Sequence, residues 1–227
     1  VLEAVASFTP SARVVITSSG EVFAPNHGET LLDEDSPTSA QSPYAVSKLL
    51  ATEASVFMRD YTGVQISVAY LFPHESVDRP VSFVSRKITR NVARIALGDQ
   101  APFELGNVDA VRDWGWAEDY IDGLIRISSS HPPSDYVLAT GVGHSVREFL
   151  TAAFQVVGIE DYSRYVRTDA SLLRKNDTLQ RLGDAGKARR ELGWEPRTQF
   201  VEIVKRMVEH DMADMKGRAL PDEQPGS

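Results

Sequence analysis

The chain has 227 residues, of which 42% are hydrophobic and 25% charged, as is ordinary for a soluble globular protein. Its formal net charge of −8 argues against nucleic acid or an anionic membrane surface as the main partner. The absence of cysteines excludes disulfides and thiolate zinc sites, and no apolar run approaches the roughly 20 residues of a membrane span. We therefore expect a cytoplasmic protein with no membrane or nucleic-acid partner.

The first half of the chain predicts strands separated by a loop and a helix. Residues 13–18 form a short β-branched run typical of a buried strand. Residues 21–41 are rich in Pro, Gly, Asp, Ser and Thr, which indicates a long loop; loops of this length are usually functional or disordered. A helix should begin with Ser42 as N-cap and Pro43 in its first turn, and end at Gly63. A buried strand over 64–72 and a helix over 82–97 follow.

The second half continues this alternation. Residues 119–128 predict a helix and 135–140 a strand. Ser145 and Glu148 form a capping box for a helix that runs to about Gly158. Further helices are expected over 184–192 and 199–213, and 216–227 should be a flexible tail. Strands that alternate with helices predict an α/β fold with a parallel sheet.

Tyr44 and Lys48 are the first candidate site residues. Their spacing places both side chains on one face of the predicted helix. Because a neighbouring ammonium stabilises a phenolate, a tyrosine in this position suits acid/base catalysis. Taken alone, the same spacing also describes a surface tyrosine beside a solvated lysine.

Ser19 and Glu21 are the second pair of candidates. They follow the first predicted strand in the stretch ITSSGEVFA, at the end of the strand where open α/β sheets bind ligands. Ser19 suits a hydrogen bond to a substrate hydroxyl, and Glu21 suits proton transfer. A plain polar turn remains the alternative for this stretch on its own.

Several separated stretches resemble the extended short-chain dehydrogenase/reductase family, and within it the GDP-mannose 4,6-dehydratases. The stretches are SSGEVFA, SPYAVSK, LFPHES, FVSRKITRNVARIALG, LGNVDAVRDWGWAEDYIDG, YVLATGVGHSVREF and LGDAGKARRELGWEP. The resemblance implies an incomplete doubly wound Rossmann-type parallel sheet with a smaller C-terminal domain that binds the sugar nucleotide. On this basis, 1–72, with sheet elements near 108–140, belongs to the NADP-binding domain, and 73–107 and 141–215 belong to the substrate domain.

The same resemblance implies a lyase that dehydrates GDP-mannose, or a close GDP-sugar, to the GDP-4-keto-6-deoxy sugar. Ser19, Tyr44 and Lys48 match the catalytic Ser/Thr and the Tyr–Lys pair. Tyr44 would take the O4 proton while the C4 hydride passes to NADP. Glu21 would remove the C5 proton and help water leave from C6, after which the hydride returns to C6.

Binding roles are implied in the same way. Beside Tyr44 and Lys48, His74 and Arg79 match positions that contact NADP; without the family, His74 would be an ordinary loop histidine. The positions that hold GDP match four residues that would otherwise be surface charges, namely Lys87, Arg112, Arg174 and Asp177. The remaining histidines show no metal-ligand spacing, so we expect no metal site.

Some positions depart from the family pattern. Pro73 stands where the family has asparagine, Trp116 where histidine is common, Lys175 where proline is usual, and Asp177 is shorter than the usual glutamate. These changes leave open a GDP-heptose dehydratase, or a reductase or epimerase that acts on a GDP-4-keto sugar.

The Gly-rich turn that holds the cofactor pyrophosphate in this family has no match in the chain, which also begins without methionine. We therefore expect about 100 residues to precede it. A truncated, inactive chain that binds GDP-sugars is accordingly a further alternative. In related enzymes the helix over 42–62 packs across a two-fold axis, so we expect a homodimer or homotetramer.

Overall fold

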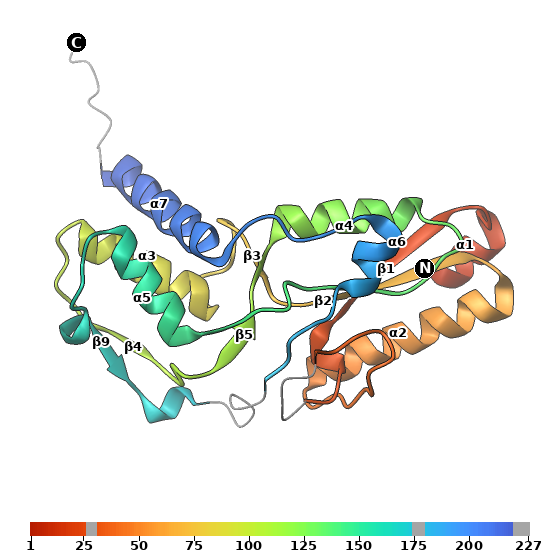
Figure 1. Cartoon of the computed structure of the whole chain (residues 1–227), viewed down its shortest axis with the longest axis horizontal. Coiled ribbons are helices and arrows are strands. Elements are labelled where there is room, and N and C mark those ends of the chain that lie inside the picture. The colour runs from red at the N-terminus through yellow and green to blue at the C-terminus, as the bar shows by residue number, and fades with distance from the viewer. Residues whose placement is uncertain (26–30, 174–179, 220–227) are drawn as a thin grey trace, which may run out of the picture. The chain divides into compact units, whose positions relative to one another are not determined.

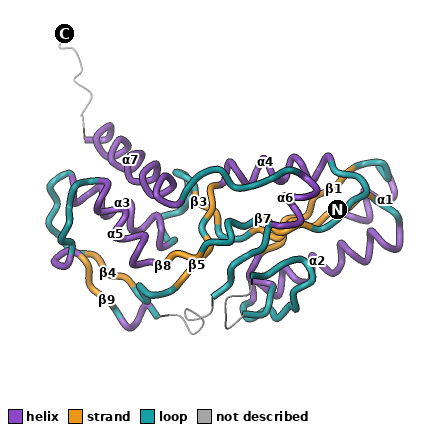
Figure 2. Tube along the Cα trace, in the orientation of Figure 1, coloured by secondary structure: helices purple, strands orange, loops and turns teal. Residues whose placement is uncertain are grey.

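The computed structural model describes residues 1–25, 31–173 and 180–219. The chain forms two compact units, each built from separate stretches of sequence (Figures 1 and 2). Unit 1 contains Val1–His74, Val111–Gly143 and Leu179–Thr198, and unit 2 contains Glu75–Ala110, His144–Thr178 and Gln199–Ser227. The assignment of cofactor and substrate binding to separate domains stays a prediction.

The centre of unit 1 is a parallel sheet in the order β1-β2-β7. Its strands are β1 (Arg13–Ser19), β2 (Gln65–Leu71) and β7 (Tyr136–Leu138). The register of β1 and β2 runs from Arg13 opposite Gln65 to Ser19 opposite Leu71, so their carboxyl ends are level. The three strands predicted from apolar runs are thus confirmed, and they pair in the parallel fashion expected of an α/β fold.

Helices cover both faces of this sheet (Figure 1). Helix α2 (Pro43–Thr62) packs on one face, over a core that includes Phe23, Val68 and Phe72. Helices α4 (Ala117–Ser129) and α6 (Gly186–Leu192) pack on the other face, over a core that includes Tyr120 and Trp194. Burying an apolar stripe of each helix on the sheet stabilises this layered arrangement.

Local signals explain where α2 begins and ends. The Ser42 hydroxyl accepts a hydrogen bond from the Ala45 amide at 3.0 Å, which satisfies one of the free N–H groups of the first turn. Gly63 ends the helix with φ of 71°, in the left-handed region that favours glycine. Both predicted boundaries are confirmed.

Shorter elements complete unit 1. They are α1 (Leu2–Phe8), the 3₁₀ turn η1 (Gly20–Val22), β5 (Val111–Asp113) and β6 (Gly115–Trp116). Strand β3 (His74–Glu75) and strand β8 (Gly143–Ser145) lie where the chain passes from unit 1 to unit 2. The predicted loop over 21–41 contains η1 and a bridge between Phe23 and Thr38.

Unit 2 is built around three helices that pack on one another, α3 (Val84–Ala96), α5 (Val146–Val156) and α7 (Phe200–Ala219). The predicted capping box of α5 is present, with the Glu148 amide donating to the Ser145 hydroxyl at 3.0 Å. Strands β4 (Phe103–Leu105) and β9 (Val166–Thr168) pair in parallel, and two 3₁₀ turns, η2 (Ser163–Tyr165) and η3 (Ala170–Leu172), flank β9.

Helix α7 runs past the expected end at 213 to Ala219, so it includes the first residues of the segment predicted as a flexible tail. The residues Met212–Lys216 are mostly good helix formers, which allows the helix to continue. In the part of the chain that the structure describes, no helix is long and apolar enough to cross a bilayer.

Candidate active site

The candidate catalytic residues lie at the carboxyl edge of the unit 1 sheet. Ser19 is the last residue of β1 and lies opposite Leu71, the last residue of β2. Glu21 follows in η1, and His74 follows β2 by three residues. In parallel sheets this edge is where loops present ligand-binding groups, and the strand order alone therefore brings these side chains to one edge.

Ser19 and Glu21 are held by local hydrogen bonds. The Ser19 hydroxyl accepts a hydrogen bond from the Glu21 amide at 3.2 Å. This bond caps the 3₁₀ turn and holds the Ser19 side chain against the backbone of Glu21. The Ser42 hydroxyl donates to the Glu21 Oε2 atom at 3.4 Å. Because Ser42 is also the N-cap of α2, this contact joins the glutamate to the start of the helix that carries Tyr44.

Tyr44 and Lys48 meet at the first turns of α2. The Lys48 Nζ atom lies 5.8 Å from the centroid of the Tyr44 ring and donates to the Thr17 carbonyl of β1 at 2.9 Å. The ammonium is therefore anchored to the sheet, while the Tyr44 side chain is 51% exposed. The structure thus brings Ser19, Glu21, Tyr44 and Lys48 to one region of unit 1.

These residues fit the reactive end of a nicotinamide cofactor. An ammonium has three N–H donors, and within the described chain the Lys48 ammonium uses one of them, on Thr17. The others are suited to ribose hydroxyls next to an accessible tyrosine. A Gly-rich turn for the pyrophosphate is absent from the sequence, so the fit concerns this end of the cofactor alone.

His74 and Arg112 also belong to unit 1. The His74 Nδ1 atom is 2.9 Å from the Phe72 carbonyl, and the ring packs on Tyr120 at a centroid distance of 4.9 Å. The Arg112 Nη1 atom donates to the Val111 carbonyl at 2.8 Å. His74 follows β2 at the carboxyl edge of the central sheet, whereas Arg112 lies in β5, which is not a strand of that sheet.

The other predicted binding residues are placed differently. Arg79 belongs to unit 2, where its Nε atom is 3.4 Å from the Glu75 Oε2 atom and its guanidinium stacks on the Phe83 ring at 3.7 Å. Lys87 is also in unit 2, on α3. Hydrogen bonds from Ser171 lower the pKa of the nearby Asp169 carboxyl, and the charge of Lys87 adds a smaller effect in the same direction. Arg174 and Asp177 lie outside the described residues, so the GDP set predicted from the sequence stays a prediction.

Asp113 is a buried acceptor that the sequence did not reveal. Its Oδ1 atom accepts from the Thr140 amide at 2.9 Å and the Thr140 hydroxyl at 2.5 Å. Its Oδ2 atom accepts from the amides of Gly141 at 3.0 Å and Gly183 at 3.1 Å. Burial raises the pKa of this carboxyl, and the four hydrogen bonds oppose that shift. Asp113, at the end of β5, therefore joins the loop that follows β7 to the segment around Gly183.

Arg181 is a second residue that sequence reasoning missed. Its Nε atom donates to the Phe23 carbonyl at 3.0 Å, just after the turn that carries Glu21. Burial lowers the pKa of the partly buried guanidinium, Glu21 opposes this shift and Arg112 adds to it. No sequence signal beyond its place next to LGDAGKA pointed to this position.

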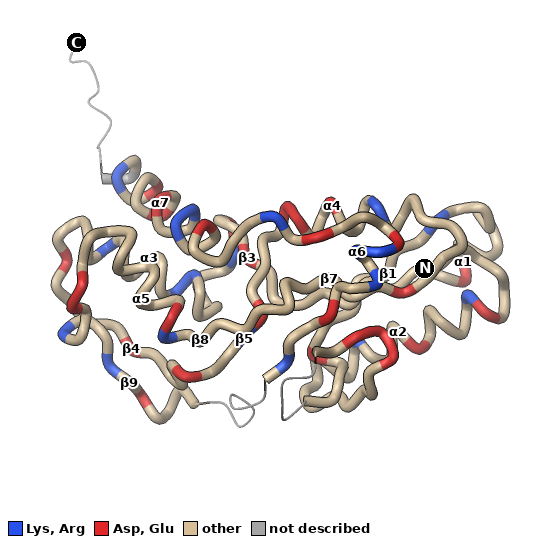
Figure 3. The backbone as a smooth tube through the Cα atoms, viewed as in Figure 1, with Lys and Arg blue, Asp and Glu red and all other residues tan. Residues whose placement is uncertain are grey.

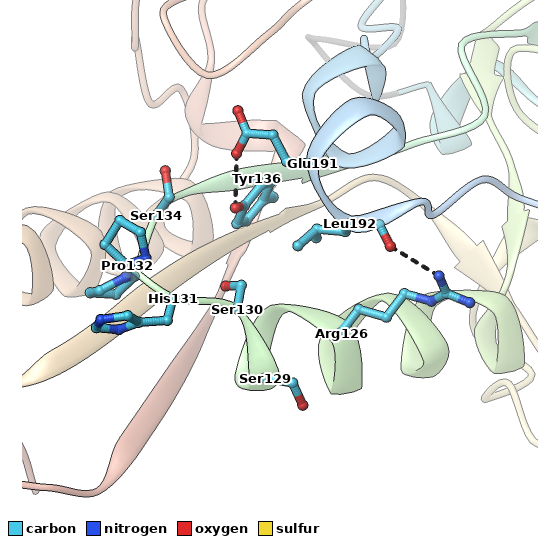
Figure 4. A pocket seen from close by; sticks show the side chains of 10 residues that line it. Arg126, Ser129, Ser130, His131, Pro132, Ser134, Tyr136, Glu191 and Leu192 are labelled. Atoms are coloured by element: carbon cyan, nitrogen blue, oxygen red, sulfur yellow. Dashed lines mark hydrogen bonds between the residues drawn. The ribbon is translucent and has the colours of Figure 1, made fainter.

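A cavity of about 660 Å³ lies elsewhere in unit 1 (Figure 4). It is lined by residues at the end of α4, by the loop before β7, and by Tyr136, whose hydroxyl donates to Glu191 at 3.0 Å. Because Tyr136 is the first residue of β7, this cavity lies toward the amino ends of the strands. It is separate from the candidate catalytic residues.

Charged residues of both signs are interspersed along α4 and α7, as they are over much of the chain (Figure 3). This pattern is typical of solvated helix faces and differs from the single-sign surface of a nucleic-acid-binding protein. The charged side chains at the carboxyl edge of the sheet, and not a surface charge of one sign, therefore decide which ligands the site attracts.

A family model described as GDP-mannose 4,6 dehydratase matches residues 1–207 of the chain. GDP-mannose 4,6 dehydratase 2 of Arabidopsis thaliana is 40% identical over 218 residues, which cover 93% of this chain and 57% of the relative. GDP-mannose 4,6 dehydratase of Homo sapiens is 37% identical, with 81% of this chain and 54% of the relative covered. The chain thus spans about half the length of the curated relatives it matches.

Solved structures match the fold. RMD from Pseudomonas aeruginosa, complexed with NADPH, gives a TM-score of 0.85 at 23% identity and covers 94% of this chain and 71% of its own. DesIV, a dTDP-glucose 4,6-dehydratase from Streptomyces venezuelae with NAD and TYD bound, gives 0.83 at 23% identity, with 95% and 64% covered. These matches confirm the predicted Rossmann-type α/β fold.

Proposed function

Because the chain belongs to the GDP-mannose 4,6-dehydratase family, we propose that it carries the acid/base half of an NADP-dependent lyase. The reaction is the dehydration of GDP-mannose, or a close GDP-sugar, to the GDP-4-keto-6-deoxy sugar. The observation that carries this proposal is the assembly of Ser19, Glu21, Tyr44 and Lys48 at the carboxyl edge of one parallel sheet.

Tyr44 is the group that exchanges a proton with the sugar O4 atom. Its exposed ring is accessible to a substrate, and the Lys48 ammonium beside it stabilises the phenolate that forms when the proton leaves. Its hydrogen bond to the Thr17 carbonyl holds the Lys48 ammonium in place before the reaction begins. The positive charge is therefore already in position when the phenolate forms. Ser19, at the end of β1, orients the O4 hydroxyl.

Glu21 distinguishes dehydration from simple alcohol oxidation. Once C4 carries a carbonyl, the proton on C5 becomes acidic, and a carboxylate can remove it. The same carboxyl group then gives a proton to the hydroxyl that leaves from C6 as water. Glu21 is exposed at the sheet edge and is held by the Ser42 hydroxyl, which supports this role.

NADP, when bound, supplies the acceptor and the donor of the hydride. Tyr44, Lys48, His74 and Arg79 are the residues of this chain proposed to hold it. The GDP moiety is proposed to contact residues that suit phosphate and guanine, namely Lys87, Arg112, Arg174 and Asp177. Guanidinium groups donate paired hydrogen bonds to phosphate oxygens, and a carboxylate accepts from the N–H edge of guanine.

The exposed side of α2 supports a homodimer or homotetramer. Its side chains Val46, Leu50, Phe57 and Tyr61 are 45%, 66%, 63% and 79% exposed. They recur at helical spacing and form one stripe, which we call the α2 stripe. Phe57 and Tyr61 stack on each other with ring centroids 5.6 Å apart. An apolar stripe of this kind is suited to a second copy of the same helix across a two-fold axis.

A second candidate is binding of GDP-sugars without turnover. A reductase or epimerase that acts on a GDP-4-keto sugar is the remaining alternative within the family.

The test is incubation of the protein with GDP-mannose and NADP, followed by mass spectrometry of the nucleotide sugar. Dehydration predicts a product lighter by one water, with no net change in NADPH absorbance. Consumption of NADPH with a GDP-4-keto sugar, and an unchanged GDP-mannose, would support the reductase instead. GDP binding by calorimetry without any product would support the second candidate, binding of GDP-sugars without turnover.

A further inference from the structure

Arg79 lies in the loop between Glu75 and α3, and backbone contacts within unit 2 fix this loop. The Arg79 amide donates to the Ser76 carbonyl at 3.3 Å, and the Phe83 amide donates to the Pro80 carbonyl at 3.0 Å. Each bond closes a tight turn in which a carbonyl accepts from the amide three residues later. The backbone that carries Arg79 and Phe83 is therefore held in a defined conformation.

The Arg79 guanidinium is held on two sides. Its central carbon, Cζ, lies over the Phe83 ring, 3.7 Å from the ring centroid, which is a cation–π contact. Its Nε atom is 3.4 Å from the Glu75 Oε2 atom. The Glu75 side chain is 2% exposed, and the same oxygen accepts a hydrogen bond from the Ser85 hydroxyl at 2.7 Å. The carboxylate that faces Arg79 is thus itself fixed.

The terminal nitrogens of this guanidinium are open to a ligand. The Nε atom of Arg79 is enclosed by protein, whereas Nη1 and Nη2 are not, and the side chain is 26% exposed. Within the described ranges, Nη1 and Nη2 donate no hydrogen bond to another residue. Two amino groups in one plane can donate paired hydrogen bonds to two oxygens of a phosphate group.

Holding the guanidinium in advance favours binding. A free arginine side chain loses rotamer freedom when a ligand fixes it, and that loss weakens the complex. Phe83 and Glu75 restrict the Arg79 side chain before any ligand arrives. Removing Glu75 would change both the position of Arg79 and the charge around it, whereas removing the Phe83 ring changes the position alone.

We propose that Phe83 is a positioning residue, which orders Arg79 so that its terminal amino groups bind a phosphate group of a nucleotide ligand. NADP and the GDP part of a nucleotide sugar both carry such a group. The inference rests on the proposed function, in which Arg79 is one of the residues that hold NADP.

The experiment measures binding of NADP, GDP and guanosine by calorimetry to the 227-residue chain and to its F83A and F83Y variants. Phe83 is 43% exposed and its side chain makes no capping hydrogen bond at the start of α3, so alanine should not unfold the chain. We expect F83A to weaken binding of NADP or GDP about threefold to tenfold, because the ligand must then order the arginine. F83Y keeps an aromatic ring and should restore the affinity. Binding of guanosine, which has no phosphate, should stay unchanged.

A double-mutant cycle shows whether Phe83 acts through Arg79. R79Q removes the charge and should weaken binding of the same nucleotide about tenfold or more. Adding F83A to R79Q should then have no further effect. L97A is the matched control, because Leu97 is 42% exposed and follows the other end of α3. It should leave all three affinities unchanged.

The outcomes separate this inference from the proposed function. If the unmodified chain binds neither NADP nor GDP, the proposed function fails and the inference fails with it. If the chain binds a nucleotide and F83A binds it equally well, the inference alone is wrong. It is also wrong if F83A weakens binding to the same extent in the R79Q variant. A loss for NADP alone assigns the phosphate to the cofactor, a loss for GDP alone assigns it to the nucleotide sugar, and each supports the inference.

Discussion

Tyr44 is the residue on which proton exchange with the sugar depends. Replacing it with phenylalanine keeps the ring, which is half exposed, but removes the only proton that it can exchange. In an active preparation, Tyr44→Phe should lower the turnover rate at least about 100-fold, which is typical for loss of a general acid or base. Affinity for GDP should change little, because the proposed GDP contacts lie elsewhere.

The rate of product formation and the calorimetric Kd for GDP check this together. Tyr61→Phe is a matched control, since Tyr61 lies at the other end of α2 and is 79% exposed. It should leave both quantities unchanged. A variant of Tyr44 that binds GDP poorly but turns over normally would assign Tyr44 to binding and contradict its catalytic role.

Asp113 makes a different kind of contribution at the residue scale. Both of its carboxylate oxygens accept two hydrogen bonds, so an amide nitrogen at either position would face N–H or O–H donors. Asp113→Asn should therefore lower the free energy of unfolding by about 3 kcal/mol, the cost of leaving buried donors without an acceptor.

Urea unfolding followed by circular dichroism measures this loss. The control is Asp109→Asn, because the ion pair that Asp109 makes with Arg147 is exposed on both sides. That variant should stay within about 0.5 kcal/mol of the unmodified chain. Equal stability of the two variants would show that the network around Asp113 is not a structural requirement.

The helices and long strands could be predicted from sequence because their signals are local. Ser42, Pro43 and Gly63 act on the backbone within a few residues of α2, and Ser145 with Glu148 does the same for α5. Strands β1 and β2 have seven residues each and contain runs of apolar and β-branched residues. Strands β4 and β9 have three residues each and contain charged side chains, so no periodicity marks them.

The site was predictable only where its residues are close in sequence or match a known motif. Ser19 and Glu21 are two residues apart, and Tyr44 and Lys48 are one helical turn apart. Asp113 instead meets Gly183 through a contact between residues 70 positions apart, and Arg181 meets Phe23 across 158 positions. Such contacts follow from the tertiary fold, and a single sequence contains no local pattern that announces them.

At the scale of the element, the α2 stripe predicts self-association. Phe57→Glu should break it, because a charge in the middle of an apolar helix interface remains desolvated without a partner. We expect the unmodified chain to have at least twice the monomer mass of 25.0 kDa by light scattering, and the variant to have the monomer mass.

Ile125→Glu is the matched control for this prediction. Ile125 is 60% exposed, close to the 63% of Phe57, but it lies on α4, on the opposite face of the sheet. If both variants stay associated, the interface lies elsewhere. If the unmodified chain has the monomer mass, the α2 stripe has no role in self-association.

At the scale of the whole molecule, buried carboxyl groups occur in both units. Asp113 in unit 1 and Glu75 and Asp211 in unit 2 are each 2% exposed or less. Burial raises the pKa of all three above the ordinary value, although hydrogen bonds or neighbouring arginines oppose the shift. These three groups should therefore make the free energy of unfolding fall as the pH rises above the ordinary pKa of a carboxyl group. Surface carboxylates that are stabilised in their charged form have the opposite effect.

Glu75 allows a test of this dependence, because its hydrogen bond from Ser85 can survive substitution. The Ser85 hydroxyl donates to the Glu75 Oε2 atom at 2.7 Å, and the carbonyl oxygen of a glutamine can accept the same bond. In the folded chain the pKa of Glu75 lies above its ordinary 4.5, so the folded state binds this proton more tightly than the unfolded state does. Between the two pKa values, the free energy of unfolding falls as the pH rises.

Glu75→Gln removes the titratable group and with it the contribution of Glu75 to the slope of the free energy of unfolding against pH. From pH 4.5 toward neutral pH, the unmodified chain should lose stability relative to the variant, by at most about 1.4 kcal/mol per pH unit for a single carboxyl group. Urea midpoints across this range measure the difference, and Glu104→Gln, on the exposed side of β4, should leave the slope as it is. If the free energy of unfolding has the same pH dependence in the variant and in the unmodified chain, Glu75 releases its proton as readily in the folded state as in the unfolded state. Its burial would then be fully offset by Arg79 and Ser85.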